Sequence, residues 1–220
     1  MSDFEHMYRT LLHERSTDVH KVGIFPGAFK PPHAGHYYTA LNACKNNDEV
    51  FIFASSKQRA LSTQNKSTSS GNDCDSSRYK NLLQSDSKFT SNLLSIRPAE
   101  CARMTSASAV RAAIAVKDKE TILLNLPEGL GEDEKDQVYN ILMQSNDISS
   151  SEYGHINKDQ MMRIWSIYRE LLSREGNTDI NNIHINISEG SPVRDTYELV
   201  EDINNSDSAR EVSIQLYVGT

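Results

Sequence analysis

The chain is poor in the residues that mark secreted and membrane proteins. Its 220 residues include only three cysteines, none in a Cys-x-x-Cys pair. We therefore expect neither a disulfide framework nor a zinc ribbon, and reduced cysteines favour a cytoplasmic location. No apolar run approaches the roughly 20 residues that cross a bilayer, and the acidic opening stretch lacks the apolar core of a signal peptide. No membrane partner is expected.

Positive charge is also scarce. The chain has 23 Lys and Arg against 30 Asp and Glu, a formal net charge of -7. Such a protein has no general field that attracts nucleic acid, so any anion that it binds must be held by local groups. A hydrophobic content of 37% and a charged content of 24% are typical of a globular chain. The length predicts one domain, residues 1–220.

Apolar runs alternate with helical patterns along the chain. At least six segments have helical periodicity, and five short runs predict buried strands: KVGIF, EVFIFAS, NLLSIRP, NNIHINIS and EVSIQLYVG. Continuous apolar strands are typical of a parallel sheet that is covered on both faces. The sequence therefore predicts an α/β fold, a Rossmann-like open parallel five-stranded sheet with helices on both faces.

Three further segments lie around this pattern. Residues 1–18 predict an amphipathic N-terminal helix. Histidines recur at every seventh position in and just after this segment. This spacing is too wide for one metal site, so the histidines indicate a solvent-exposed helix face. The polar stretches 56–77 and 144–160 predict joining loops.

The loop after the first predicted strand has an unusual composition, FPGAFKPPHAGH. In open α/β sheets this loop is the usual phosphate site. His33 and His36 are three residues apart and share one face of a helix start, where backbone amides and the helix dipole favour an anion. Gly27 lets the backbone turn or approach a ligand, and Gly35 removes side-chain bulk. A purely structural role for the histidines is the alternative.

A second segment, TSASAVR, also has residues that can bind phosphate at a predicted helix start. It places the hydroxyls of Ser106 and Ser108 at a predicted helix start, with Arg111 one turn further on. Hydroxyls and a guanidinium fork suit phosphate oxygens. An ordinary helix cap followed by a surface arginine explains the same residues.

Together the two segments resemble the nucleotidylyltransferase superfamily with its His-x-Gly-His signature. That family opens with a strand, then Gly-x-Phe-x-Pro-x-His-x-Gly-His, then a helix, and this chain has GAFKPPHAGH in that place. The segment TSASAVR is similar to the family's Ser/Thr-rich segment, with Ala107 where a serine is common and Thr105 where an apolar residue is common. The style of the sequence also resembles proteins of tailed bacteriophages.

The resemblance implies transfer of AMP or CMP from ATP or CTP to a phosphorylated small molecule, with release of pyrophosphate. The acceptor phosphate attacks the α-phosphorus directly and in line. His33 and His36 would stabilise the transition state, while Ser106, Ser108 and Arg111 would hold the leaving phosphates. Mg²⁺ would enter through the substrate phosphates, and no protein metal site is expected.

Four more residues are expected at the site. Lys30 stands where relatives carry Asp or Gln and can reach the triphosphate or the acceptor, although a solvated loop lysine is the alternative. Ala28 and Phe29 belong to the motif loop that is expected to contact the nucleotide. Arg194, in the first turn of a later predicted helix, can contact the acceptor phosphate or a base edge. A capped structural helix explains Arg194 equally well.

The order of the segments departs from the family. The strand that ends in Gly219 and Thr220, expected to help hold the ribose, comes last here, after the Ser/Thr/Arg segment. Two blocks look exchanged, through a natural or engineered rearrangement or a reordering in the recorded sequence. Every expected strand is still present, so we expect the same fold, with these two residues at a free end.

Two other functions stay open. A non-catalytic nucleotide-binding or regulatory module fits the altered Ser/Thr segment and the displaced ribose loop. A class I aminoacyl-tRNA synthetase shares the histidine signature, but this chain is short and acidic and lacks a lysine-rich second motif. The expected partners are a nucleoside triphosphate and its acceptor, and a homo-oligomer is possible.

Overall fold

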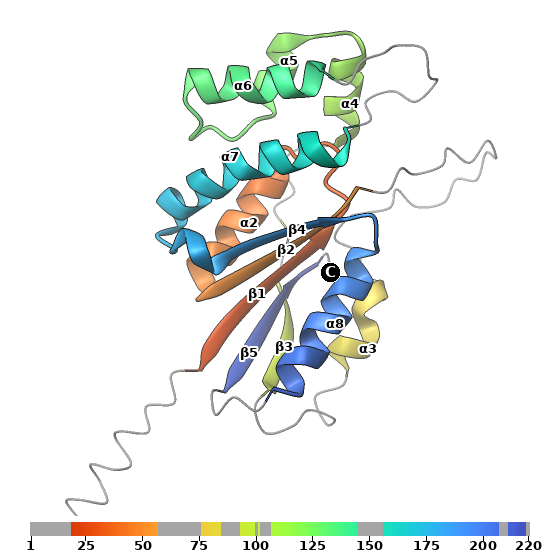
Figure 1. Ribbon diagram of the computed structural model, residues 1–220, viewed down its shortest axis with the longest axis vertical. Helices are drawn as coiled ribbons and strands as arrows, with labels where there is room; N and C mark the ends of the chain where they lie inside the picture. The colour runs from red at the N-terminus through yellow and green to blue at the C-terminus, as the bar shows by residue number, and fades with distance from the viewer. Residues whose placement is uncertain are drawn as a thin grey trace, which may run out of the picture.

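The fold is built on one sheet of five parallel strands (Figure 1). The computed structural model describes residues 19–56, 76–84, 93–99, 101, 107–144, 156–206 and 211–218, so the predicted helix within 1–18 lies outside the described residues. The sheet has the order β3-β5-β1-β2-β4. Its strands are β1 (His20–Gly27), β2 (Glu49–Ser55), β3 (Leu93–Ala99), β4 (Ile183–Ser188) and β5 (Val212–Tyr217). All five coincide with predicted strands, which confirms the predicted fold class.

Helices lie on both faces of this sheet (Figure 1). One face is covered by α2 (Ala34–Asn46) and α7 (Lys158–Gly176), and the other by α8 (Pro192–Asn204) and α3 (Lys80–Leu83), which follows the short 3-10 helix η1 (Ser76–Tyr79). Another 3-10 helix, η3 (Ile180–Asn182), leads into β4. Beyond α7 lie α4 (Ala107–Ala115), α5 (Lys119–Leu124) and α6 (Glu132–Met143).

Local sequence explains the main helix boundaries. In α7, Asn157 accepts a hydrogen bond from the backbone of Gln160 in a capping box, and the helix buries Trp165 and Tyr168 against the sheet layer. Helix α8 has Ser191 as its N-cap residue and a proline at its first position, as the sequence predicts. None of the described helices has both the length and the apolar character needed to span a bilayer.

Several details differ from the sequence-based expectations. The segment Lys119–Leu124 forms α5, a helix that the sequence analysis did not predict. Helices η1 and α7 begin at Ser76 and Lys158, inside the ends of the two predicted loops. Cys44 is a free buried thiol, and burial raises its pKa to about 12, whereas Cys101 is disulfide-bonded. The expectation of fully reduced cysteines is therefore wrong for Cys101.

Candidate functional site

The parallel sheet brings distant segments to one edge. Because all strands run the same way, the loop after β1 and the segment after β3 leave the sheet at the same carboxyl edge. Only β5 separates β3 from β1. Helix α4, which follows β3, can therefore lie beside the motif loop although the two are far apart in sequence.

His33 and His36 form the start of α2. The Nδ1 atom of His33, the N-cap residue, accepts the backbone N–H of Gly35 at 3.1 Å, and the Nδ1 atom of His36 accepts the backbone N–H of His33 at 3.3 Å. The two rings stack with centroids 3.7 Å apart. Since both Nδ1 atoms act as acceptors, we infer that each neutral ring carries its proton on Nε2 and can donate from there.

Both imidazoles are held in the neutral state. The exposed fractions of His33 and His36 are only 4% and 8%. Burial, followed by the charge of Arg111, lowers the pKa of His33 to about 4. Burial, followed by the neighbouring His33, holds the pKa of His36 well below its ordinary value. At neutral pH the pair offers hydrogen-bond donors rather than positive charge.

Arg111 supplies the charge. From α4, its Nη1 atom donates to the backbone oxygen of Lys30 at 2.7 Å, and its Nη2 atom donates to Ser108 Oγ at 2.9 Å. Lys30 is three residues before His33, and the charge of Arg111 contributes to the low pKa of that histidine. The hydrogen bond to Lys30 brings Arg111 to the loop that leads into His33 and His36, and their joint action on a ligand stays a prediction.

The side chain of Phe29 packs in the core, so only the backbone of this residue could make the expected contact with a nucleotide. Its backbone has φ 47°, in the left-handed region, and its side chain is 0% exposed. The ring centroid lies 4.6 Å from Phe25, 4.9 Å from His36 and 5.5 Å from Trp165. A Cβ atom on Gly27 would lie 2.2 Å from Phe29 Cε1. The absence of a side chain at Gly27 therefore makes room for the Phe29 ring, which in turn packs against His36.

The backbone amides at the start of α2 are largely used within the protein. Ala34 donates its N–H to the backbone oxygen of Asn125 at 2.8 Å, and the N–H of Gly35 is bonded to His33. The expectation that exposed amides hold the anion is therefore wrong for these two groups. Asn125 follows α5, and no signal in the sequence pointed to its role. Arg111 is likewise bonded within the protein, to Lys30 and Ser108.

The other predicted site residues are less closely tied to this cluster. Ala28 and the side chain of Lys30 are half-buried in the motif loop. Arg194 lies on α8, and its Nε atom donates to Glu198 Oε1 on the same helix at 2.6 Å, which favours the structural interpretation of this arginine. Ser106, Gly219 and Thr220 lie outside the described residues.

Metal-binding groups were sought among the described residues, and the whole sequence was compared with known proteins. Within the described ranges, no group of three or more His, Cys, Asp or Glu side chains can hold a metal ion. A groove of about 510 Å³ beside β4 is lined by none of the residues His33, His36 and Arg111. Comparisons with protein-family models, with curated proteins and with solved structures each found no match.

Proposed function

We propose that this protein is a nucleotidylyltransferase, which transfers AMP or CMP from ATP or CTP to a phosphorylated small molecule. An acceptor phosphate oxygen attacks the α-phosphorus, and the bond from that phosphorus to the bridging oxygen breaks as pyrophosphate leaves. One observation carries the proposal: Arg111 is hydrogen-bonded to the backbone of Lys30, three residues before the stacked pair His33 and His36, in the loop at the carboxyl edge of the sheet. Open α/β sheets bind their ligands at this edge.

The residues of the cluster have complementary roles in this reaction. The Nε2–H groups of His33 and His36 donate to the α-phosphate oxygens, whose negative charge grows in the transition state. Because the rings are already ordered by the helix cap, they need little rearrangement. Arg111 pairs with the leaving phosphates through its planar fork. Mg²⁺ bound to the substrate phosphates would neutralise much of the remaining charge.

Lys30 has two roles in the proposal, one through its backbone and one through its side chain. Its backbone oxygen accepts a hydrogen bond from Arg111, which ties the loop to α4. The lysine side chain extends from the same loop and would bind the acceptor phosphate as a point charge. A positive group at this position would favour phosphorylated acceptors over neutral ones.

A non-catalytic nucleotide-binding module is the second candidate. It is favoured by the bonds that occupy both terminal nitrogens of Arg111 and by the two bonded amides at the start of α2. A site whose donors are engaged within the protein can hold a nucleotide weakly without stabilising a transition state. The two candidates differ in chemistry, so one assay separates them.

The test is release of pyrophosphate by the full chain with each nucleoside triphosphate and a panel of phosphorylated acceptors. The panel contains nicotinamide mononucleotide, phosphopantetheine and a polyol phosphate, and mass spectrometry identifies the products. We expect one pair to react and His36→Ala to lower the rate by about 100-fold or more. Arg194→Gln is the matched control and should keep the rate within about twofold. Nucleotide binding without release for every acceptor would favour the module.

A further inference from the structure

The two edges of the sheet differ in how they are protected. Edge strands expose unpaired backbone groups, and proteins commonly obstruct them with charged residues or proline. The edge strand β3 carries Arg97 and Pro98, which act in this way. The opposite edge strand, β4, reads IHINIS and contains neither a charged residue nor a proline. Within the described part of the chain, β4 is therefore the edge that is open to pairing.

The backbone of β4 shows which of its groups face outward. Ser56 donates its N–H to the backbone oxygen of Ser188 at 2.7 Å, so the polar groups of Ser188 point toward β2. Along a strand, the N–H and C=O groups of successive residues point alternately to the two sides. The corresponding groups of Ile185 and Ile187 therefore point away from the sheet, as does the C=O of Ile183, whose N–H donates to the backbone oxygen of Ile180.

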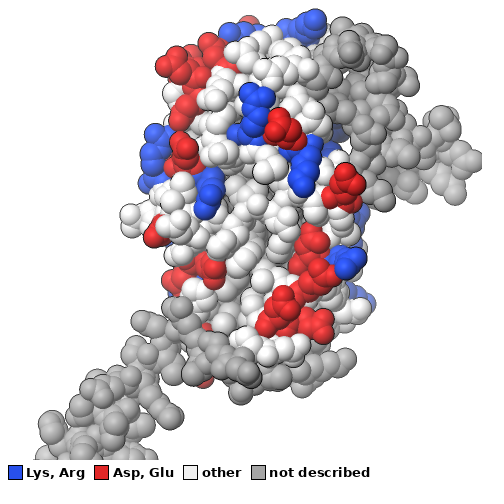
Figure 2. All heavy atoms as spheres, viewed as in Figure 1, with Lys and Arg blue, Asp and Glu red and all other residues white. Residues whose placement is uncertain are grey.

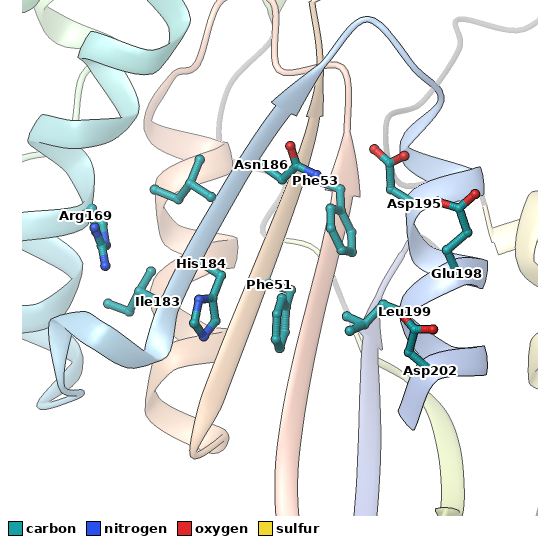
Figure 3. Close-up of a pocket in the computed structure, with 11 residues that line it drawn as sticks. Phe51, Phe53, Arg169, Ile183, His184, Asn186, Asp195, Glu198, Leu199 and Asp202 are labelled. Atoms are coloured by element: carbon teal, nitrogen blue, oxygen red, sulfur yellow. The ribbon is translucent and has the colours of Figure 1, made fainter. Parts of the chain in front are cut away.

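A groove of about 510 Å³ runs along this edge (Figure 3). On the α8 side, His184 stacks on Phe51 with ring centroids 4.5 Å apart, and Asn186 continues the groove along the strand. On the α7 side, Ile183 and Arg169 line it. Because the lining comes from both faces of one strand, the groove wraps around the edge and fits an extended chain that lies along β4.

The charged wall of the groove is acidic. Asp195, Glu198 and Asp202 lie on α8 and line the groove (Figure 3). Figure 2 shows acidic side chains gathered along this helix, beside a largely uncharged surface. Arg194 offsets part of the charge of Glu198, and Arg169 on the other side donates to the backbone oxygen of Ile180 at 2.6 Å. The wall as a whole favours a cationic occupant.

We propose that this groove binds an extended basic segment of a partner protein, which adds a strand along β4 and points lysine or arginine side chains at the wall of α8. Strand addition supplies backbone hydrogen bonds, and alternate side chains supply specificity. A second copy of the chain fits less well, because it carries a net charge of -7 and would bring acid against acid. This interaction is separate from nucleotidyl transfer and does not depend on it.

The test uses a fluorescein-labelled peptide of about seven residues that alternates lysine with valine or threonine, titrated with the full chain and followed by fluorescence anisotropy. We expect saturable binding that weakens as salt rises. The double variant Glu198→Gln/Asp202→Asn should weaken binding about tenfold or more. The matched double variant Glu189→Gln/Glu201→Gln removes two exposed charges outside the groove and should leave affinity within about twofold.

A second variant tests strand pairing itself. Ile185→Pro removes an outward N–H without touching the ladder to β2, and should weaken binding about tenfold while the nucleotidyl-transfer rate is kept. Equal binding of a peptide of the same charge with proline in place of valine and threonine would overturn strand addition. Equal binding of a glutamate peptide, or no binding at all, would overturn the basic partner. If the molecular mass measured by sedimentation doubles as the protein concentration rises, and the dimer no longer binds the peptide, the groove is occupied by a second copy of the chain.

Discussion

Arg111 Nη1 donates a 2.7 Å hydrogen bond to the backbone oxygen of Lys30, a residue 81 positions earlier in the chain. The bond joins α4 to the motif loop, and the permanent charge of Arg111 contributes to the low pKa of His33. Two segments that carry separate sequence signals therefore form a single cluster. The electrostatic link between Arg111 and His33 can be measured directly, without knowledge of the substrate.

Replacing Arg111 with glutamine should raise the pKa of His33. The guanidinium is the second cause of the low pKa, after burial, so its removal should shift the pKa upward from about 4 while burial keeps it below the ordinary value. The pKa is read from the imidazole resonances by NMR titration. Arg194→Gln removes an exposed arginine elsewhere and should leave the titration unchanged. An unchanged pKa in Arg111→Gln would show that the two groups are not close in solution.

Arg111→Lys should lower the rate of pyrophosphate release about 100-fold. Lysine keeps the charge but cannot span Lys30 and Ser108 with two nitrogens or present a planar fork to phosphate. The rate is measured with the acceptor that the panel identifies. Arg194→Lys makes the same replacement on an exposed helix and should keep full activity. Full activity of Arg111→Lys would mean that charge alone is needed there.

Acid should destabilise the protein through His33. In the unfolded chain this histidine has its ordinary pKa of 6.5, so between that value and about 4 the unfolded state binds a proton that the folded state does not. Stability is therefore complete above the unfolded pKa and falls as pH decreases. From about pH 7 to about pH 5 the expected loss from His33 is about 2 kcal/mol, and His36 adds a loss of the same sign.

His33→Asn isolates this effect. Asparagine is a good N-cap residue, so the variant keeps an acceptor for the N–H of Gly35 but no longer titrates. Urea unfolding at a series of pH values should show a shallower loss of the free energy of unfolding for this variant than for the parent chain. If the two curves run parallel, His33 is not held neutral by the fold.

The sheet could be predicted from the sequence because its strands are continuous apolar runs. Burial on both faces leaves β1 and β2 with few polar residues, and the turn residues that flank them mark their ends. The edge strand β4 alternates apolar and polar residues, yet it is bounded by equally clear polar segments. Helix α5 was missed because it is only six residues long, too short for a periodic pattern.

The site could be predicted only in outline. Its histidines and arginine lie in recognisable local patterns, and parallel strand direction is enough to bring them to one edge. Phe29 and Asn125 show what local patterns cannot give. The burial of the Phe29 ring against Trp165 and the bond from Ala34 to Asn125 both depend on contacts between distant segments.

Gly27→Ala should destabilise the protein and impair the site together. The new Cβ would lie 2.2 Å from Phe29 Cε1, so the ring must move, at a cost of about 1–3 kcal/mol. Thermal unfolding and pyrophosphate release report the two effects. Gly131→Ala is the matched control, because its Cβ would meet only Glu134 Oε2, at 3.8 Å. The double variant Gly27→Ala/Phe29→Leu should recover part of the stability, and no recovery would contradict this explanation.

Nucleotide binding should change the fluorescence of Trp165. This residue is the single tryptophan of the chain, is 0% exposed, and contacts Phe29, whose ring contacts His36. A triphosphate that accepts hydrogen bonds from the Nε2–H groups of the histidines would shift these rings and alter the packing of Phe29. We therefore expect a saturable change in emission intensity on titration with ATP or CTP. The emission maximum should stay that of a buried indole, because the ring remains in the core.

Two variants make the fluorescence signal specific. Phe29→Leu preserves an apolar contact but removes the aromatic link, so it should reduce the signal while binding, measured by calorimetry, is kept. His36→Ala should weaken the apparent affinity, since it removes one of the proposed donors to the phosphates. A red shift on nucleotide addition would show that Trp165 becomes exposed, and binding without any change in emission would place the nucleotide away from the His33 and His36 pair.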